Sequence, residues 1–230
     1  MKKTELINII ETLAPLDTQE PWDNCGWQIS NDNDEINKVM LCLSVTKNVI
    51  EQAKEQNCDL IISHHPLFFI PFELNQNIPV YSAHTNLDKA QGGTTDTIIE
   101  RLGYKRSENL EEFVRVVEDN ISIDDFILKL KIGLNLFNIR VSNYDNKKVF
   151  KKIAFCAGSG SEFESVALEH GADALVTGDV KYHTALDSKI TLIDIGHFES
   201  EIPVVKTLAN LLYSKVEVSI ANETSPLRNF

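Results

Sequence analysis

The chain has 230 residues, which is enough for one large domain or for two small lobes that each bury a core. Its 22 basic and 34 acidic residues give a formal net charge of −12 at pH 7, which disfavours nucleic acid binding by a basic face. The longest apolar runs, such as residues 60–62 and 67–71, are too short to cross a bilayer, so no membrane association is expected. The first 17 residues have apolar positions at helical spacing without a continuous apolar stretch, which predicts an amphipathic helix and a cytoplasmic protein.

The four cysteines, Cys25, Cys42, Cys58 and Cys156, are far apart and form no CxxC pair. Cys42 and Cys156 lie inside apolar runs that are typical of strands. This pattern predicts reduced, buried thiols and argues against a cysteine-rich zinc site.

Strands and helices alternate in the first half of the sequence. The expected elements are strands over 38–45, 59–63 and 80–83, helices over 48–56 and 94–103, and a loop over 64–79. Helices of this length between buried strands predict an α/β fold with a parallel or mixed sheet.

The second half repeats this alternation after a more polar middle. The middle contains a helix over 121–130, with Ser122 as its cap, and a turn over 143–148. Strands are then expected over 152–156, 174–177, 191–195 and 216–220, and helices over 162–169 and 202–213. We therefore expect a first lobe over 1–106, a connecting segment over 107–150 and a second lobe over 151–230.

Two pairs of segments indicate a weak internal duplication. CDLIISHH at 58–65 aligns with ADALVTGD at 172–179, and YSAHTNLD at 81–88 aligns with DIGHFESE at 194–201. The alignment pairs His84 and Asp88 with His197 and Glu201. Since ligands collect at the carboxyl ends of strands in open α/β sheets, we expect two related lobes with equivalent strand ends facing one cleft.

The histidines point to metal chemistry. Five of the six (His64, His65, His84, His183 and His197) come at or just after the end of a predicted strand. Imidazole binds Zn, Mn, Fe, Co or Ni, and adjacent histidines leaving a strand diverge, which suits two ions better than one. Imidazoles with carboxylates such as Asp88 and Glu201 are typical of two-metal hydrolytic sites, although any single pair has a plain surface interpretation as well.

Three other motifs have two interpretations each. Gly158-Ser159-Gly160-Ser161, between a strand and a helix, fits a phosphate loop or a turn that needs positive φ. Lys181 and His183 fit a substrate contact or a surface loop. Asp23-Asn24-Cys25-Gly26 predicts a tight turn anchored in the core by Trp22 and Trp27, with Asp23 able to orient a ligand histidine.

These motifs together resemble the GTP cyclohydrolase I type 2 homologue family, also called the NGG-interacting-factor-like family. The matching segments, in order, are WDNCGWQ at 22–28, ISHHPLFF at 62–69, AHTNLDKAQGG at 83–93, GSG at 158–160, TGDVKYH at 177–183 and DIGHFESE at 194–201. The resemblance implies two related α/β lobes with mixed sheets and a dinuclear metal site in the cleft between them. The metal ligands it implies are His64, His65, Asp88, His197 and Glu201.

The resemblance also implies a toroidal homohexamer, and the short stretch over 104–150 implies the compact form without an inserted domain. Ser44 departs from the family pattern, in which Asp is common. The function expected is a metal-dependent hydrolase of a nucleotide or phosphorylated small molecule, GTP cyclohydrolase-like, with two divalent ions (Zn, Mn, Fe, Co or Ni) per subunit and with His84 and His183 moving protons. The alternative is a metal-binding scaffold, metal chaperone or interaction platform without turnover, because family likeness does not fix a substrate.

Overall fold

The computed structural model describes residues 1–67 and 78–227. The chain forms two compact units: the first unit holds residues 1–93 and 204–224, and the second unit holds 94–203 and the described residues from 225 onward. Most of the loop expected over 64–79 lies outside the described residues.

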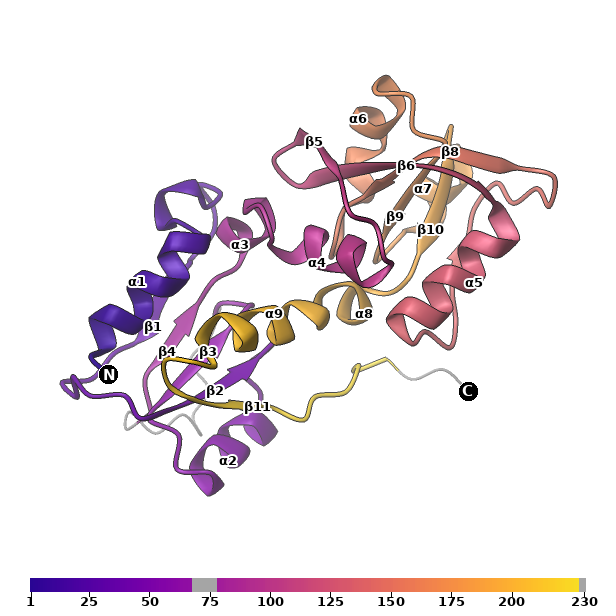
Figure 1. The fold of residues 1–230 in the computed structure, drawn as a ribbon. Coiled ribbons are helices and arrows are strands. Elements are labelled where there is room, and N and C mark those ends of the chain that lie inside the picture. The colour runs from indigo at the N-terminus through magenta and orange to yellow at the C-terminus, as the bar shows by residue number, and fades with distance from the viewer. Residues whose placement is uncertain (68–77, 228–230) are drawn as a thin grey trace. The chain divides into compact units, whose positions relative to one another are not determined.

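The first unit contains a five-stranded mixed sheet in the order β1-β4-β3-β2-β11 (Figure 1). Its strands are β1 (Gly26–Ile29), β2 (Lys38–Cys42), β3 (Leu60–Ser63), β4 (Val80–Ser82) and β11 (Glu217–Ile220). β11, β2, β3 and β4 run parallel, and β1 pairs antiparallel with β4. The polar ends of β3 and β4 therefore emerge at the same edge of the sheet.

Helices cover both sides of this first sheet. They are α1 (Lys3–Leu13), the 3-10 turn η1 (Leu16–Thr18), α2 (Lys47–Glu55), α3 (Thr85–Lys89) and α9 (Pro203–Leu212). Figure 1 places α2 on one side of the sheet and α1 and α9 on the other. The apolar face of α2 packs on the buried side chains of Met40, Cys42 and Ile61, as its helical spacing predicts.

The second unit contains a six-stranded mixed sheet in the order β5-β6-β8-β9-β10-β7. Its strands are β5 (Glu108–Glu111), β6 (Val114–Ser122), β7 (Arg140–Val141), β8 (Val149–Phe155), β9 (Ala174–Thr177) and β10 (Thr191–Asp194). β8, β9 and β10 run parallel, while β5, β6 and β7 pair antiparallel with their neighbours.

Two apolar layers enclose the second sheet. Its helices are α4 (Thr94–Arg101), α5 (Ile123–Leu134), the 3-10 turn η2 (Ser161–Phe163), α6 (Glu164–Glu169), α7 (Tyr182–Asp187) and α8 (His197–Glu201). Residues of α4 and α5 form one core with Phe150, Phe155 and Val176. Side chains of α6 and α7, including Ala167 and Ala185, pack against the opposite face, where Leu175 and Leu192 are buried. Ser122 caps α5 as expected, since its side chain accepts a hydrogen bond from Asp125 N.

Each unit has its own set of three central parallel strands, and this similarity agrees with the duplication inferred from the sequence. β2-β3-β4 corresponds to β8-β9-β10, and each set has an antiparallel strand on the outer side of its last member. Asp59 accepts from Asn37 N and Lys38 N, and Asp173 accepts from Lys151 N and Lys152 N, at equivalent positions. The same pattern of hydrogen bonds from backbone N–H groups to an aspartate therefore occurs at the start of the parallel strands in both sheets.

The sheets divide the chain at other points than the expected 106 and 150. The segment 107–150 is no connector, because β5, β6, α5 and β7 belong to the second sheet and its covering layer, and β11 returns to the first sheet. β6 has a polar sequence for two reasons: its buried Arg115 pairs with Asp96, with Arg115 Nε 3.3 Å from Asp96 Oδ2, and none of its residues from Glu118 onward is buried. A paired buried charge gives a polar sequence to an interior strand.

Among the described residues, no helix is long and apolar enough to cross a membrane. All four cysteines are free thiols; Cys42, Cys58 and Cys156 are buried as expected, whereas Cys25 is half-buried.

Candidate metal centre

Three imidazoles gather at one sheet edge of the first unit. His64 and His65 follow β3, and His84 follows β4 at the residue that caps α3. The ring centroids lie 5.0 Å (His64–His65), 5.1 Å (His64–His84) and 5.5 Å (His65–His84) apart. One ligand nitrogen from each ring lies within 4.8 Å of those of the other two. The parallel pairing of β3 and β4 brings these side chains together, as the sequence predicts.

Each of these rings is held through its Nδ1 atom. His64 Nδ1 lies 2.9 Å from Ala83 O, and His84 Nδ1 lies 3.0 Å from Asp23 Oδ1. A carbonyl or carboxylate oxygen only accepts, so in both rings Nδ1 donates and Nε2 keeps its lone pair. His65 Nδ1 lies 2.7 Å from the hydroxyl of Ser44, the position that departs from the family pattern.

Asp23 ties its own loop to this cluster. Its Oδ1 accepts from His84, while its Oδ2 accepts from Thr85 N at 3.0 Å and from the Thr85 hydroxyl. Burial raises the pKa of Asp23, but the hydrogen bonds from Thr85, His84 and Cys25 outweigh it and hold the pKa well below its usual value. Burial and the neighbouring His64 lower the pKa of His84, which keeps this imidazole neutral.

Asp88 supplies the carboxylate of the first unit. It lies on α3, four residues after His84, and its Oδ1 is 3.6 Å from His64 Nε2. His64 is fully buried, so this carboxylate faces the interior end of the cluster. A nitrogen and oxygen donor set of this kind suits a borderline divalent ion.

The second unit offers one imidazole and one carboxylate. His197 and Glu201 are the first and last residues of α8, which follows β10. His197 Nδ1 lies 2.7 Å from Asp179 Oδ2, and His197 Nε2 lies 3.0 Å from Glu201 Oε2. The hydrogen bonds with Glu201 and, to a smaller extent, Asp179 raise the pKa of His197 to about 9 against the opposing effect of burial.

The glycine loop after β8 makes room for Glu201. A Cβ atom on Gly158 would lie 2.3 Å from Glu201 Oε1, and its φ of +65° also favours glycine. Gly158 N donates to the Ser200 hydroxyl at 2.9 Å and Gly160 N donates to the Thr177 hydroxyl at 2.8 Å. Both backbone donors are thus used inside the second unit, which favours the turn over the phosphate loop.

Asp194 positions the residues around His197 in the second unit and was not singled out in the sequence. Its Oδ2 accepts from Val180 N at 3.1 Å and its Oδ1 accepts from Gly196 N at 2.9 Å. Val180 directly follows Asp179, and Gly196 directly precedes His197. Asp194 is 5% exposed and forms an ion pair with Arg140, and its place at the end of a buried strand is the signal that points to it.

The sequence matches a known protein family over nearly its whole length. The family model described as Duf34/NIF3 (NGG1p interacting factor 3) matches residues 1–226. The chain belongs to the DUF34/NIF3 family. This confirms the resemblance found in the motifs.

Relatives of this DUF34/NIF3 protein match it over nearly their full length. A protein of Campylobacter jejuni named GTP cyclohydrolase 1 type 2 homolog is 36% identical over 249 residues, with 100% of both chains covered. A protein of Helicobacter pylori named GTP cyclohydrolase 1 type 2 is 32% identical, with 97% of both covered. The crystal structure of the Staphylococcus aureus hypothetical protein SA1388 matches with a TM-score of 0.89 and 25% identity, covering 100% of this chain and 99% of that one.

Two residues that the sequence singled out in this DUF34/NIF3 protein, Trp22 and His183, are exposed. Trp22 is 67% exposed and does not anchor the turn in the core as predicted, because the Asp23 carboxylate holds the loop through polar contacts; Trp27 is also partly exposed. His183 is exposed on α7, and within the described part of the chain its ring contacts Tyr182, with centroids 5.2 Å apart. It does not join the groups of ligand atoms that gather.

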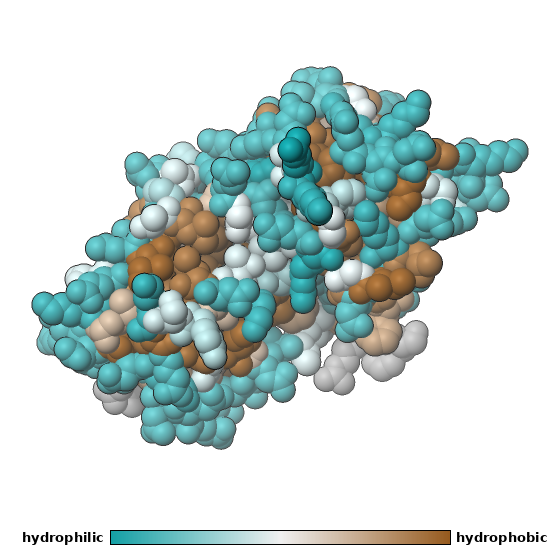
Figure 2. Space-filling model, in the orientation of Figure 1, coloured by the Kyte–Doolittle hydropathy of each residue, from teal (hydrophilic) through white to brown (hydrophobic). Residues whose placement is uncertain are grey.

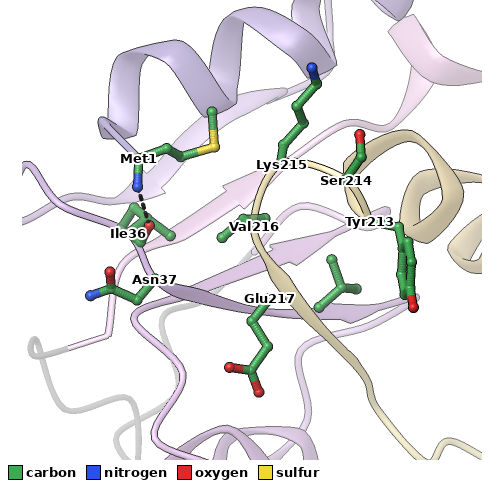
Figure 3. Close-up of a pocket in the computed structure, with 9 residues that line it drawn as sticks. Met1, Ile36, Asn37, Tyr213, Ser214, Lys215, Val216 and Glu217 are labelled. Carbon is green, nitrogen blue, oxygen red and sulfur yellow. Dashed lines mark hydrogen bonds between the residues drawn. The ribbon is translucent and has the colours of Figure 1, made fainter.

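The first unit of the protein also has a surface pocket of a different character (Figure 3). It lies where the chain leaves α9 for β11 and is lined by Met1, Ile36, Asn37 and residues 213–218. Its carboxylate, Glu217, lies 2.9 Å from Lys38 Nζ. The lining has no histidine, so this pocket does not offer the donors of a transition-metal site.

Proposed function

We propose that this protein binds two divalent metal ions with His64, His65, Asp88, His197 and Glu201, and hydrolyses a nucleotide or another phosphorylated small molecule. The observation that carries the proposal is the common orientation of four imidazoles. Each has its Nδ1 atom within hydrogen-bond distance of a protein oxygen; Nε2 keeps its lone pair in His64 and His84, and in His197 it lies 3.0 Å from Glu201 Oε2, the other proposed ligand of the second unit. Orientation of this kind by outer carboxylates and carbonyls is the usual support of histidine ligands in metal sites. The name of the Helicobacter pylori relative supports the substrate class.

The donor chemistry fits such ions, because nitrogen and carboxylate ligands without thiolates suit Zn, Mn, Fe, Co or Ni. Divalent ions in a hydrolytic site supply Lewis acidity and make water a better nucleophile near neutral pH. The protein contributes orientation: Asp23 and Asp179 fix the rings of His84 and His197. His84 is poised to accept a proton at Nε2, since its pKa is lowered and the Asp23 carboxylate at Nδ1 stabilises the cation formed.

The homohexamer implied by the resemblance is part of this proposal. Leu128 and Ile132 of α5 and the following Phe137 are exposed, and apolar side chains gather over this part of the second unit on the face drawn in Figure 2. Exposed apolar groups of this kind are typical of surfaces that subunit contacts cover.

Elemental analysis of purified variants tests the ligand set. We expect Glu201→Ala to lose both ions, because a long carboxylate side chain is suited to bridge them, and His64→Ala to lose mainly one. Glu199→Ala, on the same helix, is the matched control and should keep both. Full occupancy of both ions in Glu201→Ala would contradict the assignment.

Turnover separates the hydrolase from the scaffold or metal chaperone. Metal-loaded protein is incubated with a panel of nucleotides, GTP included, and release of formate or phosphate is measured. We expect His84→Ala and His183→Ala to keep their metal and lose most of the turnover. A metal-loaded wild type that turns over no member of the panel would favour the scaffold.

A further inference from the structure

The exposed Trp22 stands beside the histidine cluster of the first unit. Its indole is 67% exposed, although tryptophan is highly buried on average. Its ring centroid lies 6.3 Å from that of His84, with an angle of 78° between the planes. A large, solvent-exposed aromatic ring therefore lies next to the cluster of three imidazoles, in contact with His84.

The loop that carries Trp22 is tied down on both sides. Asp23 N donates to Glu20 O at 3.0 Å, and Glu20 N donates to the Thr85 hydroxyl at 3.0 Å. The Asp23 carboxylate binds His84 and Thr85, at the start of α3. The same contacts that orient the His84 ring thus hold the backbone on either side of Trp22.

Other exposed aromatic residues of the first unit differ from Trp22. Trp27 packs edge-on against Tyr81, with centroids 5.2 Å apart, and has Lys3 Nζ 5.4 Å from its ring. Tyr213 is 82% exposed but lines the pocket of Figure 3. Among the described aromatic residues of this unit, Trp22 is the exposed one that contacts a cluster imidazole.

We propose that Trp22 is a stacking platform that selects a planar heteroaromatic ligand, such as a nucleobase, for the site at His64, His65 and His84. Indole offers a flat polarisable face that favours offset stacking on another aromatic ring. Such stacking accepts any base, because every base has a π face. The inference rests on the proposed function and deepens it. The ring of the substrate stacks on Trp22, and the polar groups of the substrate lie at the metal site.

Binding to metal-loaded protein tests the platform with two probes, GTP and inorganic triphosphate, measured by isothermal titration. Trp22→Ala should weaken GTP binding by about tenfold or more, while Trp22→Phe keeps most of the affinity. Inorganic triphosphate has no ring, so its affinity should not change. Tyr213→Ala is the matched control for loss of an exposed aromatic side chain and should change neither affinity.

Fluorescence gives a second measurement that does not depend on activity. The chain has two tryptophans, so Trp27→Phe leaves Trp22 as the single reporter, and GTP should quench it while triphosphate should not. Equal weakening of both probes by Trp22→Ala would overturn the proposal. So would GTP binding no tighter than triphosphate to the wild type, or a change in oligomeric state as the main effect of Trp22→Ala. Metal content, measured on the same samples, shows separately whether the metal site of the proposed function holds.

Discussion

The first and second units present two versions of one arrangement. In both, polar residues follow two neighbouring parallel strands, β3 and β4 in the first unit and β9 and β10 in the second. A short helix then begins at or directly after a histidine and has a carboxylate four residues further on: His84 and Asp88 at α3, His197 and Glu201 at α8. The first unit has His64 and His65 after β3, where the second has Gly178 and Asp179 after β9. A Cβ atom on Gly178 would lie 2.7 Å from His197 N, so the second unit has no space for a side chain there. One unit is thus rich in imidazoles, and the other relies on carboxylates.

The two units also differ in how deeply their histidine supports are buried. The side chain of Asp23 is fully buried beside His84, whereas that of Asp179 is 49% exposed beside His197. Burial strengthens a charge-assisted hydrogen bond and exposure screens it. The histidine cluster of the first unit is therefore held more rigidly, and the order of His197 and Glu201 in the second unit depends more on the close fit of Glu201 to Gly158.

The largest expected effect comes from filling the space that Glu201 occupies. Gly158→Ala places a methyl group 2.3 Å from Glu201 Oε1, so the carboxylate must move. We expect metal affinity to fall by about tenfold or more, as for other changes that misplace ligands. The measurement is metal content and affinity by competition with a chromophoric chelator.

Gly171→Ala is the matched control for that change. Gly171 has a φ of +73°, similar to that of Gly158, but no heavy atom lies within 4 Å of its added Cβ. Both variants should lose about 1–2 kcal/mol of stability from the left-handed backbone. Equal loss of metal by both would show that backbone strain alone explains the effect and that the close approach of Glu201 is unimportant.

A smaller effect is expected from neutralising the two supporting carboxylates. In Asp23→Asn, one side of the amide must place its NH2 against a donor, because His84 Nδ1 and Thr85 N donate to opposite oxygens. In Asp179→Asn, the amide oxygen can face His197 while the NH2 group faces solvent. We expect Asp179→Asn to lower metal affinity by less than tenfold, because His197 is a proposed ligand, and Asp23→Asn to keep its metal and lose turnover, because it acts through His84. A greater loss of metal from Asp23→Asn than from Asp179→Asn would contradict this assignment and make His84 a ligand.

Much of this arrangement follows from the sequence, and the exceptions have physical causes. The parallel centres were predictable because buried runs such as 60–63 and 174–177 match their strands, and strand ends position His64, His84 and His197. β6 was missed because its buried first half contains Arg115, which pairs with Asp96, and its second half, from Glu118 onward, is polar and not buried. The end of a buried strand marks Asp194 as a candidate, but its partners and the exposure of Trp22 could not be predicted, since both depend on which backbone groups meet a carboxylate across distant loops.

The smallest expected effect is on the pH dependence of stability after metal is removed with a chelator. The pKa of His197 is raised to about 9 in the folded protein, from an ordinary value of 6.5, chiefly by Glu201. Its contribution is therefore fully present below pH 6.5 and is lost as the pH rises through about 9. His84 has a lowered pKa, so its contribution has the opposite sign and is lost as the pH falls below 6.5. Urea unfolding of wild type and His197→Gln from pH 6 to 10 measures this, and the two midpoints should converge toward pH 10. A constant difference across that range would mean that His197 carries no extra proton in the folded protein.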